Sequence, residues 1–316
     1  MAEGLVIRTT GSWYKVLSDG QTFDCRLRGN YRLRGSKQTN PVAVGDKVVY
    51  QLQEDGTGVI HEVMERQNYI VRRATKLSKQ THVIASNIDL LCIVATVALP
   101  RTSTGFIDRL LVTAEAYNIP ACIIFNKTDL LVNDELRSQQ SHISTIYRTV
   151  GYPVLEVSAL KGEGMDSLKN TIAGRTVLFS GHSGVGKSAL LNSICPELGL
   201  REGQLSDWNL KGRHTTTFAE IHPICLDPSD KRFVTHLIDT PGIKEFGIVD
   251  FTPEEISHFF PEMRSVLAGC HFANCTHRHE PQCAVKTAVE DGRIPVERYN
   301  NYLNMIEDVE QDQTQF

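Results

Sequence analysis

An eight-residue segment, Gly181–Ser188, places the strongest constraint on how this chain can fold. Its residues, Gly-His-Ser-Gly-Val-Gly-Lys-Ser, match the phosphate-binding pattern G-x-x-x-x-G-K-[S/T] at every fixed position. The segment follows an apolar run over 176–179 and precedes a predicted helix over 188–194. In this context backbone N–H groups converge on phosphate at a helix N-terminus. The sequence therefore predicts a phosphate-binding strand–loop–helix unit within an α/β fold.

Each residue of this loop has an expected part in binding a nucleotide. Lys187 is expected to reach the β- and γ-phosphates as a catalytic residue, and the Ser188 hydroxyl is expected to ligate Mg²⁺. The glycines let the backbone come close to phosphate oxygens, because they carry no side chain. The predicted nucleotide-binding residues of the loop are Gly181, His182, Ser183, Gly184, Val185, Gly186, Lys187 and Ser188.

Two further motifs indicate which base is bound. Asn126-Lys127-Thr128-Asp129 follows a predicted strand over 121–125, at the end of the strand where ligands bind in open α/β sheets. An aspartate there accepts hydrogen bonds from the ring N–H and the exocyclic amine of guanine, whereas adenine offers an acceptor at the matching ring nitrogen. Ser158-Ala159-Leu160 follows another predicted strand, over 154–157, and fits a loop on the other side of the base. The expected base-binding residues are Asn126, Lys127, Asp129, Ser158 and Ala159.

An acidic turn, Asp239-Thr240-Pro241-Gly242, follows a short predicted strand over 236–238. Asp239 is expected to hold Mg²⁺ through water, and the Gly242 N–H is expected to contact the γ-phosphate. Together with Lys187 and Ser188, this turn predicts a site for GTP or GDP with Mg²⁺.

A polar segment over 212–217, Gly-Arg-His-Thr-Thr-Thr, suits a mobile switch loop. We assign Thr216 a catalytic and Mg²⁺-binding role, although threonines flank it on both sides. Many GTPases place a water-orienting glutamine directly after the glycine of the acidic turn, whereas this chain has Ile243 after Gly242. Ile243 has no hydrogen-bonding group, so we expect slow hydrolysis by the isolated protein and assign the water-orienting role to His214.

The order of the motifs is unusual. In ordinary GTPases the phosphate loop comes first, whereas here both base-binding motifs, at 126 and 158, precede the phosphate loop at 181. Apolar runs over 88–97, 121–125, 154–157 and 176–179 alternate with helical stretches over 105–117 and 134–150, which predicts a parallel sheet covered by helices. Residues 73–248 are therefore predicted to form a circularly permuted GTPase domain, because permutation does not change which strands pair.

Residues 1–72 read as a separate small β-barrel of five short strands with turns between them, over 4–10, 13–17, 21–27, 47–52 and 58–63. An oligonucleotide-binding (OB) barrel fits this count, and an SH3-like barrel fits it as well. Residues 1–80 carry 13 Lys and Arg against 8 Asp and Glu, while the rest of the chain is acidic. A basic cluster in this region is a candidate RNA-binding surface, with a solvated loop as the alternative: Arg26, Arg28, Arg32, Arg34 and Lys37.

Residues 249–316 form a third predicted unit, mainly helical, with helices over 253–267 and 295–308. Between these helices the spacing Cys270-x4-Cys275-x-His277-x5-Cys283 supplies three thiolates and one imidazole, the ligands of a closed structural Zn²⁺ site. His271 and His279 are alternatives for the fourth ligand. The other five cysteines are isolated in the sequence and are expected to be thiols of the core.

The basic barrel, the permuted GTPase motifs, the Gly-Arg-His-Thr-Thr-Thr segment and the cysteine–histidine spacing together resemble the family of ribosome small-subunit-dependent GTPases called RsgA, YjeQ or YloQ. The resemblance covers nearly the whole chain. It implies an OB-fold domain, a permuted GTPase domain and a zinc domain that bind the small ribosomal subunit and its rRNA late in maturation. It also implies that the subunit stimulates hydrolysis of GTP to GDP and phosphate.

Composition limits the remaining alternatives. A chain of 316 residues that is 41 % hydrophobic and 22 % charged is ordinary globular protein, with no predicted membrane span and no signal peptide. We therefore expect a cytoplasmic monomer. One alternative is a nucleotide-gated RNA-binding module with negligible hydrolysis. The other, a metabolic kinase, is disfavoured by Asn126-Lys127-Thr128-Asp129.

Overall fold

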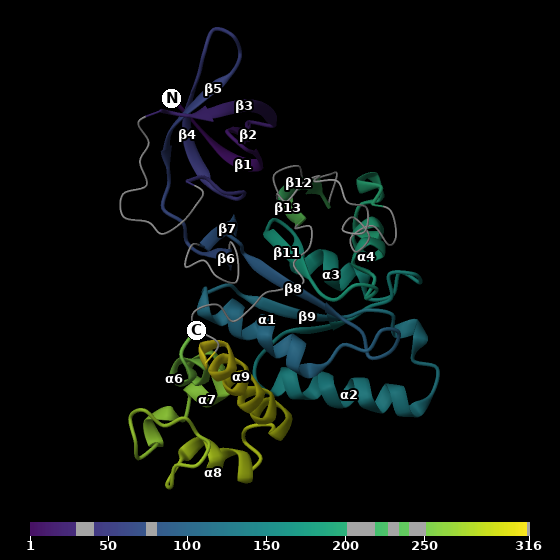
Figure 1. The fold of residues 1–316 in the computed structure, drawn as a ribbon. Coiled ribbons are helices and arrows are strands. Elements are labelled where there is room, and N and C mark those ends of the chain that lie inside the picture. Colours follow the sequence, from purple (N-terminus) through teal and green to yellow (C-terminus); the bar gives the residue numbers. More distant parts are fainter. Residues whose placement is uncertain (30–40, 74–80, 201–218, 227–233, 240–250, 315–316) are drawn as a thin grey trace.

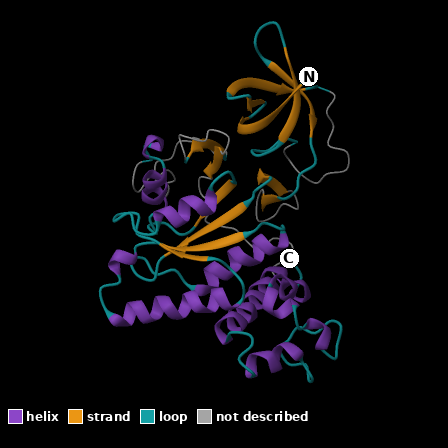
Figure 2. Cartoon of the chain, turned by 180° about the vertical axis from the view of Figure 1, so that it is seen from behind, coloured by secondary structure: helices purple, strands orange, loops and turns teal. Residues whose placement is uncertain are grey.

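The computed structural model describes residues 1–29, 41–73, 81–200, 219–226, 234–239 and 251–314. Three units follow one another along the chain (Figure 1). A β-barrel holds the N-terminus, a helix-covered sheet lies in the middle, and a helical unit holds the C-terminus. The view from behind shows that the barrel and the helical unit lie on opposite sides of the central sheet (Figure 2).

The N-terminal barrel is closed. Its five strands are β1 (Ala2–Thr10), β2 (Trp13–Ser18), β3 (Gln21–Leu27), β4 (Lys47–Leu52) and β5 (Gly58–Val63). They pair in the cycle β1-β2-β3-β5-β4-β1, with β3 and β5 parallel and the other pairs antiparallel. This closed order is that of an OB barrel, so the OB prediction is confirmed over the SH3-like alternative. The barrel interior is filled by Val6, Tyr14, Val16, Cys25, Val42, Val48, Tyr50 and Ile60.

A hairpin of β6 (Tyr69–Arg73) and β7 (Thr81–Ser86) joins the barrel to the central sheet. One carboxylate fixes the barrel to it: buried Asp46 accepts from Arg66 Nε at 2.7 Å, from Arg66 Nη2 at 2.8 Å and from Ser86 Oγ at 2.6 Å. The neighbouring Gly45 has a φ of +92°, and a Cβ there would lie 2.1 Å from the carbonyl oxygen of Ser86. The sequence did not predict this hairpin.

The central sheet places the phosphate-loop strand in its middle. Its strands are β8 (Leu90–Ala95), β9 (Ala121–Phe125), β10 (Val154–Glu156), β11 (Thr176–Ser180), β12 (Glu220–Cys225) and β13 (Val234–Asp239). In the described part of the chain their order is β10-β9-β8-β11-β13-β12, and all pairs are parallel except β12 with β13. The parallel strands therefore end at a common edge, where the loops predicted to bind the nucleotide meet.

Helices cover both faces of this sheet. The buried strand β8 sends alternate side chains to opposite faces, because the side-chain period of a strand is two. Leu91, Ile93 and Ala95 pack under α1 (Thr104–Ala116) and α2 (Asp134–Thr149). The intervening residues Leu90, Cys92 and Val94 pack under α3 (Met165–Ile172) and α4 (Lys187–Ile194). The predicted helix-covered parallel sheet is confirmed.

The C-terminal unit consists of short helices and one long one: α6 (Pro253–Ile256), α7 (Pro261–Arg264), α8 (Ala284–Glu290) and α9 (Val296–Thr314). The helical segment predicted over 253–267 is helical in large part, but it is broken at Phe260 into shorter helices. Phe260 is extended, with φ −105° and ψ 105°, because a proline disfavours helical geometry in the residue before it. Pro261 then starts a new helix, which turns buried Phe260 into the core of this unit.

Among the described residues, no helix combines the length and apolar character that crossing a membrane requires.

We predict that Asp46→Ala lowers the free energy of unfolding by about 3 kcal/mol, because it removes the buried carboxylate that accepts from both Arg66 and Ser86. Asp24→Ala is the matched control, because its pair with Lys15 in the same barrel is exposed and should contribute less than about 1 kcal/mol. Urea unfolding of both variants measures the difference. Equal effects of the two substitutions would contradict the role given to Asp46.

Candidate functional site

The phosphate loop turns from β11 into α4 at the centre of the sheet edge. Gly181, Gly184 and Gly186 have φ values of +156°, +83° and +88°, which residues with side chains rarely adopt. A Cβ on Gly181 would lie 2.3 Å from the Val94 carbonyl oxygen, and one on Gly186 would lie 2.5 Å from Asn126 Nδ2. The glycines therefore keep the loop tight against β8 and β9, with its backbone free of side chains at these positions.

Lys187 lies at the end of the phosphate loop, and its side chain bonds back to that loop. Its ammonium donates to the carbonyl oxygens of Gly181 at 2.5 Å and His182 at 2.7 Å. Ser188 is buried in the first turn of α4, where the partial positive charge of a helix N-terminus favours anions. The loop thus gathers the cation, the hydroxyl and the helix N-terminus that a nucleotide phosphate requires.

Asn126 links the base-binding loops to the phosphate loop. Its side chain is 3 % exposed, and Nδ2 donates to the Val185 carbonyl at 2.9 Å. Its Oδ1 accepts from the Ala159 N–H at 3.1 Å. A single side chain thereby fixes three loops relative to one another.

Lys127 forms a second link between the same loops. It has a left-handed φ of +64°, and its ammonium donates to the carbonyls of Leu99 at 2.6 Å and Gly184 at 2.7 Å. The side chain therefore extends from the end of β9 across to the phosphate loop.

The carboxylate of Asp129, which is predicted to contact the base, is oriented by Ser158. The Ser158 hydroxyl donates to Asp129 Oδ1 at 2.5 Å and accepts from the Lys161 N–H at 3.1 Å. Two large apolar side chains of this region, Leu99 and Leu160, are 74 % and 85 % exposed. Exposed leucines beside these loops are suited to cover the flat face of a base.

Several predicted residues lie outside the described part of the chain. These are His214, Thr216 and Gly242 of the site, and Arg32, Arg34 and Lys37 of the basic cluster. Asp239 ends β13, which lies parallel and next to the phosphate-loop strand β11, but its side chain also lies outside the described set. The roles of all these residues stay predictions.

The four predicted metal ligands come together between α7 and α8. The ligand atoms of Cys270, Cys275, His277 and Cys283 lie within 4.8 Å of one another. His277 Nδ1 faces the cluster, 3.4 Å from Cys283 Sγ and 3.7 Å from Cys270 Sγ. Three sulfurs and one nitrogen at this spacing fit a tetrahedral Zn²⁺ site. Burial raises the pKa of the Cys275 thiol to about 12, and metal binding would require this thiol to lose its proton.

The loop that carries these ligands is organised by Glu280. Its carboxylate accepts from the backbone N–H groups of Thr276 at 2.7 Å and Arg278 at 2.9 Å, and from the Thr276 hydroxyl at 2.7 Å. Burial disfavours the charge, but these bonds outweigh it and lower the pKa of Glu280 to about 2. From α9, the Tyr299 hydroxyl donates to the His277 carbonyl at 2.7 Å, which holds the loop against the helix.

On the barrel, β2 and β3 bring a cation over an aromatic ring. The guanidinium of Arg26 lies 3.9 Å from the Trp13 ring centre, and the two residues are register partners across the strand pair. Arg26 and Arg28 belong to the predicted basic cluster, whereas Trp13 was not predicted. The hairpin register implied by the turn at Asp19-Gly20 would have revealed it.

Residues 63–249 match the sequence model of the RsgA GTPase, and residues 3–60 match that of the RsgA N-terminal domain. The first match covers more than half of the chain. The chain belongs to the RsgA GTPase family. It is therefore a GTPase, and the resemblance identified from its motifs is confirmed.

Similar proteins cover nearly the full length of this RsgA family member. A protein of Bacteroides fragilis named "Small ribosomal subunit biogenesis GTPase RsgA" is 50 % identical over 310 residues, which is 98 % of this chain and 97 % of that protein. One of Flavobacterium johnsoniae with the same name is 48 % identical over 308 residues, 96 % of this chain and 92 % of that protein.

Two solved structures are similar as well. YjeQ from Thermotoga maritima has a TM-score of 0.78 and 35 % identity, covering 97 % of this chain and 98 % of that one. YloQ, described as a circularly permuted GTPase, has a TM-score of 0.73 and 31 % identity, covering 98 % of this chain and 96 % of that one. The permuted strand order of this RsgA family member agrees with that description, so the predicted permutation is confirmed.

Proposed function

We propose that this chain hydrolyses GTP to GDP and phosphate as a late maturation factor of the small ribosomal subunit. One observation carries the proposal: the side chain of Asn126 bonds both the phosphate loop and the loop after β10. It thereby places the phosphate loop beside Asp129 and Ser158, the pair proposed to read guanine. The names of the full-length relatives support the ribosomal role.

In this proposal each loop has its own task. Asp129 accepts from the guanine ring N–H and amine, with Ser158 and Ala159 on the other side of the base. The loop 181–188 wraps the phosphates, and Lys187 leaves its two carbonyl partners to reach the β- and γ-phosphates. The Ser188 hydroxyl, Asp239 and Thr216 hold Mg²⁺, which when bound neutralises phosphate charge, and the Gly242 N–H contacts the γ-phosphate.

His214 orients the attacking water in this proposal. A neutral imidazole can accept a hydrogen bond from water, whereas Ile243, at the position that often carries a glutamine, cannot. Binding to the small subunit brings His214 into place, so hydrolysis is slow until the partner is present.

The barrel is the proposed contact with rRNA. Arg26 stacked on Trp13 offers both a charge for phosphate and a flat surface for a base, and Arg28 follows it on the same chain segment. Arg32, Arg34 and Lys37 continue this basic run in the sequence. We propose that the protein acts as a monomer in the cytoplasm, with no membrane partner.

The proposed metal at Cys270, Cys275, His277 and Cys283 is one structural Zn²⁺, which would fix the loop between α7 and α8 without taking part in hydrolysis. The fit of donor types and their closeness supports this ligand set. His271 and His279, both exposed, are not in the cluster.

The experiment that tests the function compares GTP hydrolysis with and without purified small ribosomal subunits. We expect slow turnover alone and at least tenfold stimulation by subunits, with His214→Ala retaining subunit binding and the basal rate but losing most of the stimulation. No stimulation of the wild type would instead favour the nucleotide-gated binding module. Stimulation within twofold of wild type in His214→Ala would remove His214 from the mechanism.

Asp129→Asn should weaken GTP binding and relax the preference for guanine over adenine, because an amide presents one acceptor and one donor where the carboxylate presented two acceptors. We expect GTP affinity to fall at least tenfold while ATP affinity changes by less than threefold. Competition binding against a fluorescent guanine nucleotide measures both. Unchanged selectivity would contradict the base-reading role.

Protein purified without chelators should contain about one zinc per chain. Glu280→Gln should release this zinc to a chelator about tenfold faster, because the residues that orient metal ligands commonly change metal affinity by that factor. Glu290→Gln, an exposed change at the end of α8, is the control. Metal analysis that finds no zinc in the wild type would refute the site, and equal release from both variants would refute the role of Glu280.

A further inference from the structure

The first turn of α1 contacts the phosphate loop through an aromatic stack. The rings of Phe106 and His182 lie with centres 3.5 Å apart and planes tilted by 28°. The turn is capped by Ser103, whose hydroxyl accepts from the Phe106 N–H at 3.3 Å. The backbone of Phe106 is therefore fixed at the start of the helix, and its ring is aimed at the second residue of the phosphate loop.

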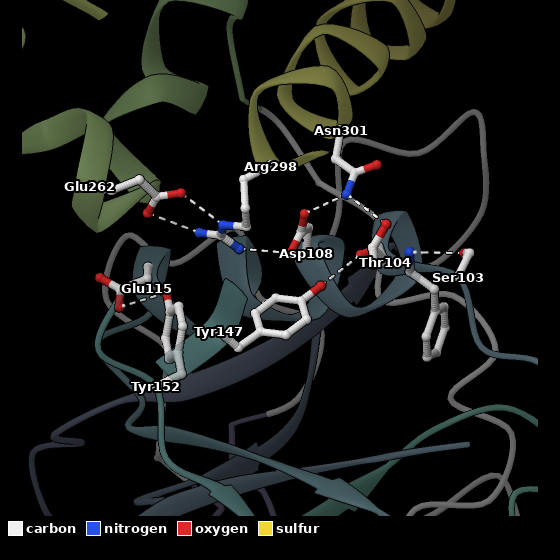
Figure 3. A network of polar contacts seen from close by, with 10 residues as sticks. Ser103, Thr104, Asp108, Glu115, Tyr147, Tyr152, Glu262, Arg298 and Asn301 are labelled. Carbon is white, nitrogen blue, oxygen red and sulfur yellow. Dashed lines mark hydrogen bonds and ion pairs between the residues drawn. The ribbon is translucent and has the colours of Figure 1, made fainter. Parts of the chain in front are cut away.

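The same turn is bound by the C-terminal unit (Figure 3). Asn301 of α9 donates from Nδ2 to Thr104 Oγ1 at 3.1 Å and to Asp108 Oδ2 at 2.6 Å. Arg298, one turn earlier on α9, donates to Asp108 Oδ1 at 2.6 Å. Thr104 and Asp108 lie one helical turn apart, so α9 holds one side of the turn that carries Phe106.

Arg298 is itself fixed from a third element. Its guanidinium donates to both carboxylate oxygens of Glu262 in α7, at 2.7 and 3.0 Å, and lies 4.7 Å from the Phe260 ring centre. The side chains of Arg298 and Asp108 are 1 % and 0 % exposed. A fully buried, multiply bonded pair tolerates little displacement, because water cannot replace a hydrogen bond that a buried charge loses.

We propose that Phe106 is a positioning residue for the phosphate loop and that α9 sets its position through Thr104 and Asp108. The chain of contacts runs from α9 to the first turn of α1, and from Phe106 in that turn to the ring of His182, the second residue of the phosphate loop. This inference rests on the proposed nucleotide site. Because coupling between two sites is reciprocal, α9 would influence nucleotide affinity, and bound nucleotide would influence the docking of α9.

The test measures the affinity for a fluorescent GDP in the full-length, zinc-loaded protein. Phe106→Ala should weaken GDP binding about two- to tenfold, the range that a lost aromatic pair produces, while Phe106→Tyr, which keeps the ring, should bind as wild type does. Asn301→Ala should weaken binding about two- to threefold in the wild-type background and not at all in the Phe106→Ala background. The matched control is Arg264→Ala, which breaks a pair between the C-terminal unit and Glu115 at the far end of α1.

The outcomes separate this inference from its alternatives. Wild-type affinity in Phe106→Ala, equal weakening by Phe106→Tyr, or full additivity of Asn301→Ala with Phe106→Ala would each overturn it. Weakening by Arg264→Ala equal to that by Asn301→Ala would overturn it as well, since it would indicate general loosening of the helical unit. Failure of the wild type to bind GDP would instead refute the proposed nucleotide site, so the two failures are distinguishable.

Discussion

The candidate nucleotide site depends on one buried amide. Asn126 follows directly after β9, and its side chain bonds the phosphate loop through Val185 and the loop after β10 through Ala159. A buried amide without partners would cost on the order of 1–3 kcal/mol, so the two bonds are strongly favoured together. Gly186 allows this approach, because a Cβ there would lie 2.5 Å from the amide nitrogen. The strand order then matters mainly because it brings the ends of β9, β10 and β11 to one edge where a single side chain can reach all of them.

This dependence explains why circular permutation leaves the site intact. The loops meet through strand pairing and through Asn126, and neither depends on where the chain is cut. What permutation changes is the position of the neighbouring units. The barrel is held by Asp46 to the hairpin that leads into β8, and also meets the sheet where Arg8 of β1 pairs with Glu220 of β12. The chain beyond β13 leads to the helical unit, which returns to the sheet through the contact of Arg298 with α1. Both flanking units thus touch elements that carry or neighbour the site.

Patterns within short stretches of sequence predicted most of this arrangement. The phosphate-loop motif, the predicted base-binding loops and the predicted metal ligands are close in sequence to the strands or turns that position them, so the spacing of the motifs predicted which of these residues lie together. The break in the helix at Phe260 could also have been predicted from the sequence, because Pro261 follows it. Contacts between distant segments were not predictable in this way. The Asp108–Arg298 pair joins residues 190 positions apart, and the stack of Phe106 on His182 joins two elements whose packing follows from the tertiary fold. Local periodicity carries no information on such pairs.

Two carboxylates, the half-buried Glu280 of the C-terminal unit and the buried Asp108 of α1, show how differently the same charge can be used. At Glu280 backbone N–H groups and a hydroxyl outweigh burial and lower its pKa, so the charge stabilises the loop that carries the metal ligands. At Asp108 burial outweighs the attraction of Arg298 and the bond from Asn301, and its pKa is raised. The same contacts raise the pKa of Arg298, because Asp108 and Glu262 outweigh the effect of burial on its charge. The Coulombic gain of the buried pair is thus offset, at least in part, by the loss of hydration. The Asp108–Arg298 pair does favour one position of α9 on α1 strongly over others, since displacement of α9 would separate charges that are buried. The contact between α9 and α1 is therefore better suited to fixing one register of the helical unit than to adding net stability.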